Sequence, residues 1–385
     1  MFRKSFILLL GVAVLAACSD KDDNAADDAF ISGSITIDKQ YGTPVPNFTA
    51  NDMISKGFSY GDMLTVRIGN TKDLVVPFVT AYTQAGIMGL SCCDYGATGG
   101  VLNIGIANGN FHDRVGGNDG DTIIISMNEK GGYLEEYKLL QASYDNIRNH
   151  YPSDAAFANF REVTTTGMGV GKLYRGSNPL NAKNNPVRYA YMDDFARQVG
   201  IQTEIDLADD DDMIAEQLAT RQDTFSYCPT LFRNGQVVAV KMSADTFNDD
   251  FKARLARAYR FIIAHEPPYL IHCNEGKDRC GFVTLLLEAL MGADVIEIEE
   301  DYMTTFENYY LYEYHSDGWI LNQKLNVDRM LRLMMYPSLL DDITTINWDL
   351  MLDATPTMLY TKTVEFLKSA GLTDSEIEQL KEKLR

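Results

Sequence analysis

The segment of residues 268–290, PYLIHCNEGKDRCGFVTLLLEAL, limits the possible folds of this chain more than any other segment. An apolar stretch ends at His272-Cys273, a short polar loop follows, and Arg279 opens a strongly apolar stretch of helical length. The short apolar run before the glycine-containing loop indicates a buried strand, and the longer run after it indicates a buried helix. A strand, a loop and a buried helix in this order are typical of an α/β layer with a largely parallel sheet.

Further segments from about residue 132 onward alternate in the same way. Short strands are predicted at 172–177, 203–208, 237–242 and 268–272, and helices at 192–199, 211–224, 248–265, 281–290 and 295–312. A helix over 132–151 joins this part to what precedes it, and Thr373 with Glu376 forms a capping box that opens the last helix. The sequence therefore predicts an α/β domain over 131–385, with a central, mostly parallel sheet and flanking helices.

Residues 31–130 have a different pattern, in which short alternating stretches are separated by Gly, Asn and Asp. This spacing predicts a small all-β domain, either a barrel or a sandwich. We expect the adjacent thiols of Cys92 and Cys93 to lie in a loop of this domain as structural filler. A chain of 385 residues is long enough to bury a core in each domain.

The N-terminus is predicted to be a targeting signal. Arg3 and Lys4 precede an apolar run, residues 6–17, that is too short to span a bilayer comfortably. The run ends in LAAC at Cys18, which resembles the lipobox of bacterial lipoproteins; the alternative is an ordinary secretory signal. Residues 1–17 are then the signal peptide, Cys18 is lipidated, and residues 18–30 form an acidic tether. We expect a protein lipid-anchored to the bacterial cell envelope, periplasmic or at the cell surface.

The charge balance excludes some partners. The chain has 34 basic and 54 acidic residues, which gives a net charge of −20. Phosphate backbones are bound by clustered Lys and Arg, so nucleic acid is not an expected partner. The same imbalance argues against a polybasic membrane patch, which leaves the lipid anchor as the expected contact with the membrane.

The loop after the strand at 268–272 has the chemistry of a phosphate site. Five residues separate Cys273 from Arg279, so the chain between them can curl around one phosphate with its backbone N–H groups pointing inward. The helix N-terminus behind the loop adds partial positive charge, which favours the thiolate of Cys273. Arg279 presents a planar fork that binds two phosphoryl oxygens, and Gly276 allows the backbone to turn under the ligand.

These residues resemble the signature of the cysteine-based protein tyrosine phosphatase superfamily. HCNEGKDR is most similar to a bacterial branch with HCxxGKDR, which contains secreted tyrosine and phosphoinositide phosphatases. The resemblance covers about 150–385, and the chain departs from the branch at Cys280, where Ser or Thr is usual. Three further segments resemble parts of that branch: NFREV (159–163), GKLYRGSNP (171–179) and IQTEIDLA (201–208).

The resemblance implies a phosphatase fold and a mechanism in two steps. Cys273 attacks phosphorus and forms a cysteinyl-phosphate, which water then hydrolyses; neither a cofactor nor a metal is required. Two candidates for the general acid stay open: Asp245, which follows a predicted strand, and Asp278, which lies inside the loop. The residues expected to bind phosphate are Asn274, Glu275, Gly276, Lys277, Asp278 and Arg279.

Three functions follow from these observations. The first is a phosphomonoester hydrolase whose substrates are phosphotyrosyl proteins. The second is the same chemistry on inositol phosphates or phosphoinositides, which Lys277 indicates because several phosphates need more positive charge than one. The third is a non-catalytic surface lipoprotein that binds phosphate.

Overall fold

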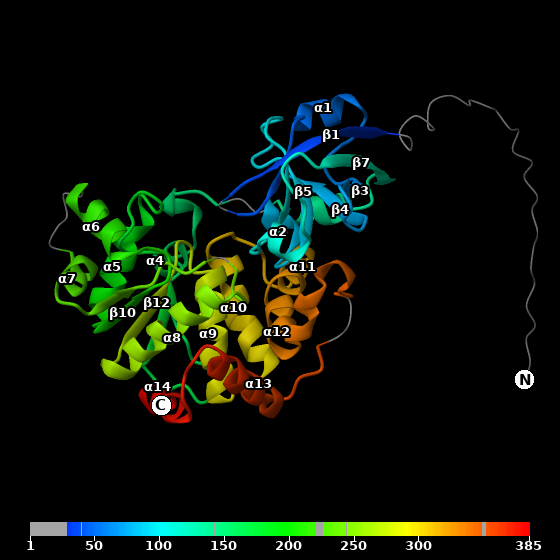
Figure 1. The fold of residues 1–385 in the computed structure, drawn as a ribbon. Helices are drawn as coiled ribbons and strands as arrows, with labels where there is room; N and C mark the ends of the chain where they lie inside the picture. The colour runs from blue at the N-terminus through cyan, green and yellow to red at the C-terminus, as the bar shows by residue number, and fades with distance from the viewer. Residues whose placement is uncertain (1–28, 40, 142–143, 221–225, 244, 349–351) are drawn as a thin grey trace, which may run out of the picture.

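The computed structural model describes residues 29–39, 41–141, 144–220, 226–243, 245–348 and 352–385. Figure 1 shows two bodies that pack side by side. We call residues 29–129 the N-terminal body and residues 154–385 the C-terminal body, and residues 130–153 connect them. The signal peptide, the lipidation site Cys18 and almost all of the acidic tether, all predicted from the sequence, lie outside the described residues.

Five strands form the sheet of the C-terminal body, in the order β11-β10-β12-β9-β8. The strands β9, β12, β10 and β11 run parallel, and β8 at the edge is antiparallel. In the register of the sheet, His272 lies opposite Gly176 on one side and Asp206 on the other. The predicted mostly parallel sheet is therefore confirmed, and the loop that begins at Cys273 leaves from its carboxyl edge. The strands are β8 (Arg161–Glu162), β9 (Leu173–Gly176), β10 (Thr203–Asp206), β11 (Val237–Ala239) and β12 (Tyr269–His272).

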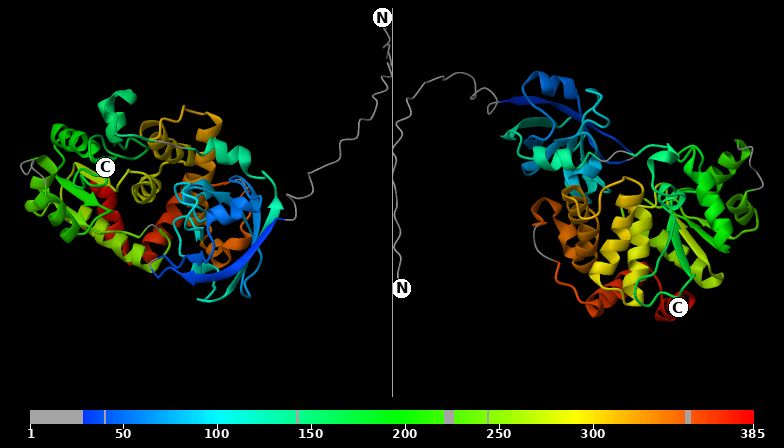
Figure 2. Two further views of the ribbon diagram at one scale, coloured as in Figure 1. Left: turned by 90° about the horizontal axis from the view of Figure 1, so that it is seen from above. Right: turned by 180° about the vertical axis from the view of Figure 1, so that it is seen from behind.

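Helices cover both faces of this sheet (Figures 1 and 2). Successive side chains of a strand point to opposite faces, so Tyr269 and Ile271 pack with α8 and α9, whereas Leu270 packs with α5, α6 and α7. The elements are α4 (Asp154–Ala158), α5 (Arg188–Val199), α6 (Asp211–Thr220), α7 (Tyr227–Arg233), α8 (Asp249–Ala264), α9 (Asp278–Met291), α10 (Val295–Asn308), α11 (Asp317–Leu325), α12 (Val327–Met335), η3 (Pro337–Asp341), η4 (Ile343–Thr345), α13 (Pro356–Ser369) and α14 (Asp374–Leu384).

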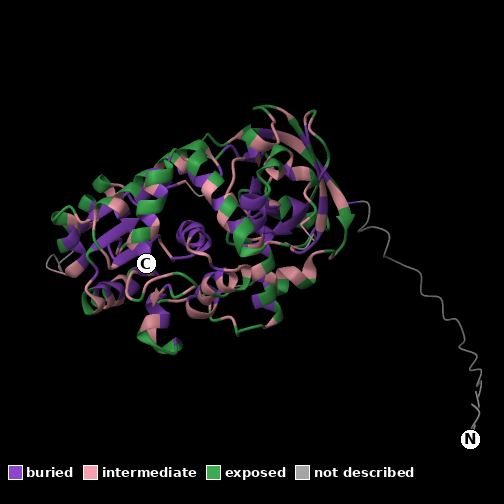
Figure 3. Ribbon diagram, turned by 90° about the horizontal axis from the view of Figure 1, so that it is seen from below, coloured by how far each residue is buried: buried purple, intermediate pink, exposed green. Residues whose placement is uncertain are grey.

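Helix α9 explains the long apolar run of the sequence. Every residue from Cys280 to Leu290 is buried, and Thr284 and Glu288 are the polar ones among them, so apolar residues occur on all sides of the helix. Figure 3 shows buried strands and helices in the interior of this body. The capping box predicted at the last helix is also confirmed, because Thr373 accepts from the Glu376 amide and Glu376 accepts from the Thr373 amide.

The N-terminal body is built on a seven-stranded sheet, in the order β2-β1-β7-β3-β4-β5-β6. Its neighbouring strands are antiparallel except for β4 with β5, which are parallel. The sheet curls, because a bridge between Thr49 and Val101 joins the chain after β2 to the chain before β6, the two edge strands. The elements are β1 (Phe30–Ile37), β2 (Pro44–Pro46), α1 (Ala50–Ser55), β3 (Met63–Ile68), β4 (Leu74–Val79), η1 (Tyr82–Ala85), β5 (Leu90–Cys93), β6 (Asn103–Ile106), α2 (Phe111–Arg114) and β7 (Thr122–Glu129).

The adjacent thiols of the N-terminal body do not lie in a loop, so that prediction was wrong. Cys92 and Cys93 are the last residues of β5, where both are fully buried and pair with β6. The strand β5, with the sequence LSCC, is covered on both faces. Its residues therefore do not alternate between apolar and polar, which is the pattern that would have predicted a strand.

The predicted helix over 132–151 was also wrong. The structure has a short α3 (Leu134–Leu139) and, later, the 3-10 turn η2 (Arg148–His150). The Asp145 side chain accepts a hydrogen bond from the Ile147 amide at 2.8 Å, and the Asp145 carbonyl accepts one from Arg188 at 2.5 Å. These bonds use backbone groups that a continuous helix would need.

Specific contacts join the two bodies. The Ile87 amide donates to the carbonyl of Leu325 at 2.8 Å, and Arg329 donates to the carbonyl of Ala85 at 2.8 Å. Both contacts fix the turn η1 of the N-terminal body against α11 and α12. Within the described part of the chain, no helix combines the length and hydropathy that a membrane crossing needs.

Candidate active site

The backbone of the loop after Cys273 is turned so that its carbonyl groups face the surrounding protein. Three successive carbonyls, those of residues 274–276, accept hydrogen bonds from buried side chains of other segments. The donors are Asn185 to the carbonyl of Asn274 (2.5 Å), Asn159 to that of Glu275 (2.8 Å) and Arg175 to that of Gly276 (2.9 Å).

The amide groups of the same loop therefore point the other way. In a planar peptide the N–H is directed opposite to the C=O, so outward carbonyls place the amides on the inner side of the curve. No acceptor among the described residues pairs with the backbone amides of 274–277. Helix α9 begins directly after them at Asp278, and its N-terminus adds partial positive charge at the same place. Free amides at a helix N-terminus form a binding site for an oxyanion.

Gly276 is required by the path of the loop. Its φ is +81°, a region that other residues enter only with strain. A Cβ at this position would lie 2.5 Å from the carbonyl oxygen of Gly176, at the end of β9. The sequence-based role of Gly276, to let the backbone turn, agrees with this geometry.

Cys273 begins the loop and is 4% exposed. Lys277 is buried next to it: burial opposes the charge of the ammonium group, but Asp278, Glu275 and the Cys273 sulfur together raise the pKa of Lys277. The Lys277 ammonium also lies 5.0 Å from the centre of the Tyr310 ring. The site therefore holds a buried cation beside the cysteine.

Arg279 is in the first turn of α9 and reaches the carboxyl edge of the sheet. Its Nη1 donates to the carbonyls of Leu207 at 3.2 Å and Met242 at 3.3 Å, which follow β10 and β11. The described residues provide no acceptor for its Nε and Nη2 atoms. The remaining donors of the guanidinium are thus available to an anion at this edge.

The two acid candidates are in different surroundings. Asp245 lies 3.7 Å from Arg114 of the N-terminal body and accepts from the Phe247 amide at 3.0 Å; burial raises its pKa, although the amide and Arg114 oppose this. Asp278 stays in the loop, where its Oδ1 is 3.7 Å from Lys277 and accepts no hydrogen bond from the described residues. The structure therefore brings Asp278 together with Lys277 and directs Asp245 toward the N-terminal body.

Cys280, the departure from the related sequences, is directed away from the loop. Its thiol donates to the carbonyl of Ile271 at 3.4 Å, and burial raises its pKa to about 11. His272 is also structural in this geometry, because its Nε2 lies 2.8 Å from the buried carboxylate of Glu204. Burial opposes the charge of the imidazole, but Asp206 and Glu204 raise the pKa of His272.

A buried ion network supports the loop, and sequence reasoning missed it. Arg175 is fully buried and bonds both the Gly276 carbonyl and Asp301 of α10, which also pairs with Arg161 at 2.9 Å. Burial would raise the pKa of Asp301, but the two guanidinium groups hold it below its usual range. Arg175 and Asn159 occur in the quoted LYRGS and NFREV segments, which was the available signal; Asp301 has no such signal.

A cavity of about 360 Å³ opens beside the loop. Its walls are the loop residues Glu275, Lys277 and Asp278, the helix α10 with the chain after it, and a part of the N-terminal body. Three residues of the loop thus line this space, whereas Cys273 and Arg279 do not.

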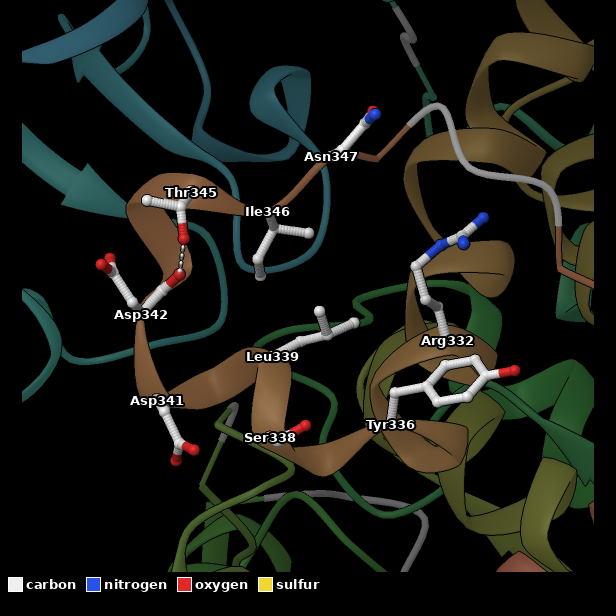
Figure 4. A pocket seen from close by; sticks show the side chains of 9 residues that line it. All are labelled: Arg332, Tyr336, Ser338, Leu339, Asp341, Asp342, Thr345, Ile346 and Asn347. Carbon is white, nitrogen blue, oxygen red and sulfur yellow. Dashed lines mark hydrogen bonds between the residues drawn. The ribbon is translucent and has the colours of Figure 1, made fainter.

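A larger cavity, about 650 Å³, lies between α12 and η4 (Figure 4). Figure 4 shows Arg332 on one side and Asp341 on the other, with Leu339 and Ile346 between them. No cysteine and none of residues 273–279 line this cavity. It is separate from the cysteine site.

No curated protein sequence matches the chain. A solved structure, that of an uncharacterized conserved protein from Thermotoga maritima, is 20% identical with a TM-score of 0.22, and the match covers 24% of this chain and 35% of that one. The chain thus spans about a third of the length of that protein. Residues 155–385 match the sequence model of the tyrosine phosphatase family. Because this match covers more than half of its length, the chain belongs to the tyrosine phosphatase family.

Proposed function

We propose that the protein is a phosphomonoester hydrolase of the HCxxGKDR branch that works through a cysteinyl-phosphate intermediate. The observation that carries this proposal is the loop after Cys273: the carbonyls of residues 274–276 are bonded to surrounding side chains, and the amides of 274–277 have no acceptor among the described residues. Cys273 stands at its beginning and Arg279 at its end. Phosphotyrosyl proteins are the first substrate class, and inositol phosphates or phosphoinositides are the alternative.

In the first step, the thiolate of Cys273 attacks phosphorus, the S–P bond forms and the bond from phosphorus to the ester oxygen breaks. The loop amides and Arg279 bind the three phosphoryl oxygens and stabilise the charge that they carry in the transition state. In the second step, water attacks phosphorus, the S–P bond breaks, and phosphate leaves with the thiolate restored. This chemistry needs no metal or cofactor.

We assign Asp278 as the general acid that protonates the leaving oxygen. It lines the cavity, its Oδ1 has no hydrogen-bond partner among the described residues, and Asp245 is paired instead with Arg114. A protonated acid is needed only when the leaving group is a poor one, which makes the assignment testable.

We also propose that the protein is a lipoprotein of the bacterial cell envelope, anchored through Cys18. The support is the sequence alone, since LAAC ends the apolar run and an acidic stretch follows. Incorporation of a labelled fatty acid into the wild type, and its loss in Cys18→Ala, is the expected result; equal labelling of both proteins would contradict the anchor.

The activity is tested by release of p-nitrophenol from p-nitrophenyl phosphate in the presence of EDTA. We expect Cys273→Ser to abolish turnover and Cys93→Ser, a buried cysteine of the N-terminal body, to retain it. Equal rates for the wild type and Cys273→Ser would contradict the mechanism. Binding of inorganic phosphate by a wild type that does not turn over any ester would instead support the non-catalytic alternative.

The acid is tested with two leaving groups. We expect Asp278→Asn to lower kcat for phosphotyrosine by about 10²- to 10⁴-fold. The loss should be smaller for p-nitrophenyl phosphate, whose leaving group needs no proton. If Asp245→Asn shows this pattern and Asp278→Asn does not, the acid is Asp245.

A further inference from the structure

The cavity beside the loop is completed by the N-terminal body. Lys277 and Asp278 of the loop line it together with the turn η1 and with Tyr95, which follows β5. These segments are far apart in the sequence, and the contacts of Ile87 and Ala85 with α11 and α12 hold η1 in place. The wall contributed by the N-terminal body is therefore a fixed part of the cavity.

This wall presents two aromatic rings. Tyr82 and Tyr95 stack with ring centres 6.4 Å apart and an angle of 26° between the rings. The Tyr82 ring lies on β6, because a Cβ at Gly105 would meet it at 2.4 Å. Its position is thus determined by the sheet beneath it.

Tyr95 is 68% exposed although the loop that carries it is firmly anchored. The preceding residue, Asp94, is fully buried and accepts from the Gly99 amide at 2.8 Å, the Thr98 amide at 3.2 Å and the Tyr60 hydroxyl at 2.6 Å. A large aromatic side chain that is exposed on a rigid loop beside a cavity contributes little to the core. Its geometry suits contact with a ligand.

The C-terminal body adds two further rings to the lining, those of Phe306 and Tyr310. The rings of Phe306 and Tyr310 lie 5.7 Å and 5.0 Å from the Lys277 ammonium. Among the described residues that line the cavity, Lys277 is the one cation, and it faces the carboxylates of Glu275 and Asp278. A ligand with several phosphates would leave most of its charge unpaired here, whereas an aromatic ring with one phosphate finds aromatic rings from both bodies in the lining.

We propose that Tyr82 and Tyr95 are specificity-determining residues, which contact the ring of an aromatic phosphomonoester whose phosphate is bound by the 274–279 loop. This proposal rests on the proposed function of the loop. It assigns to the N-terminal body the selection of an aryl phosphate over a polyphosphorylated inositol.

The test uses Tyr95→Ala in the full chain, since the exposure of Tyr95 makes this change harmless to the core. We expect kcat/KM for a phosphotyrosyl peptide to fall by about twofold to tenfold, mainly through KM, with recovery in Tyr95→Phe. The rates for β-glycerophosphate and inositol hexakisphosphate should not change. Phe30→Ala, which removes an exposed ring of the same body that does not line the cavity, is the matched control and should behave as the wild type.

A binding measurement separates this inference from the proposed function. In the Cys273→Ser background, Tyr95→Ala should weaken calorimetric binding of the phosphotyrosyl peptide by a similar factor and leave binding of inorganic phosphate unchanged. This readout holds even if the protein does not turn over esters. Equal losses for all ligands, or no loss for the phosphotyrosyl peptide, would overturn the role of the aromatic wall while leaving the cysteine mechanism intact.

Discussion

Each body of the molecule contains a cysteine at the end of a strand, Cys93 or Cys273, with a polar loop after it. The two loops differ in the hydrogen bonding of their backbone amides. After Cys93, the carboxylate of Asp94 accepts the amides of Thr98 and Gly99. After Cys273, the amides of 274–277 have no acceptor among the described residues, because the neighbouring side chains bond the carbonyls instead. The first loop supplies its own anion, and we propose that the second receives the anion of a ligand.

The charges around the two thiols also differ: a carboxylate lies beside Cys93, and a cation lies beside Cys273. Cys93 is buried beside Asp94, and burial together with that carboxylate raises the pKa of its thiol to about 12. Cys273 lies beside Lys277 and the N-terminus of α9. A cysteine after a strand does not by itself indicate a reactive thiol. The charges around it and the hydrogen-bond partners of the backbone groups that follow it are the better indication.

The largest effect is expected from removing the cation that holds the loop. Arg175→Met removes the donor to the Gly276 carbonyl and leaves Asp301 with Arg161 alone, so stability should fall by about 3–5 kcal/mol and activity should be largely lost. Urea unfolding and phosphatase assays measure the two effects. The matched change in the N-terminal body is Arg67→Met, whose ion pair with Asp73 is exposed to solvent, so its loss should lower stability far less. Similar losses in the two variants would refute the supporting role of the network.

A smaller effect is expected from one methyl group in each loop. Gly276 and Gly96 have φ values of +81° and +77°, so alanine is strained by about 1 kcal/mol in both places. At Gly276 the added Cβ also meets the Gly176 oxygen at 2.5 Å, whereas at Gly96 the nearest atom is 3.8 Å away. We expect Gly276→Ala to lower kcat/KM at least tenfold and Gly96→Ala to lower stability alone. Steady-state rates with p-nitrophenyl phosphate decide this, and normal turnover in Gly276→Ala would show that the loop need not keep this shape.

The strands of the C-terminal body, and the succession of strand, loop and helix around Cys273, could be predicted from the sequence. In these segments the local pattern of apolar and polar residues agrees with the tertiary structure. The apolar run at 269–272, the loop and the mostly apolar helix α9 follow one another directly and form one continuous signal. The capping box at Thr373 is equally local.

Long-range partners were not predictable in this way. Asp301, which holds Arg175, lies on a helix without a motif, and Asp245 pairs with Arg114 from another body. The helix expected over 132–151 failed for the same reason, because Arg188 binds the Asp145 carbonyl from a distance of 43 residues. The contribution of Tyr95 to the cavity also depends on how the two bodies pack, which no local pattern encodes.

The two bodies also differ in their buried acids. Among the described residues, the carboxyl groups whose pKa is raised all lie in the C-terminal body: Asp206, Asp245, Glu288, Glu299 and Asp328. A carboxyl group with a raised pKa in the folded state stabilises the fold when protonated, and this contribution is lost as the pH rises through the folded pKa. Alkaline destabilisation should therefore begin in the C-terminal body.

Glu299 of α10 provides the smallest and most specific test. Burial raises its pKa to about 8, and Asp328 of α12 and Asp294 at the start of α10 act in the same direction, against a hydrogen bond from Gln323 of α11. Its stabilising effect is complete below its ordinary pKa of 4.5 and is lost between that value and about 8. We expect the melting temperature of the wild type to fall by about 2–4 °C more than that of Glu299→Gln between pH 5 and pH 8.5. The neighbouring Glu300 is exposed, so Glu300→Gln should follow the wild type. If Glu299→Gln and Glu300→Gln respond alike to pH, the α10–α12 contact is not the source of the alkaline sensitivity. The buried carboxyl groups of the C-terminal body would then not make it less stable at alkaline pH than the N-terminal body.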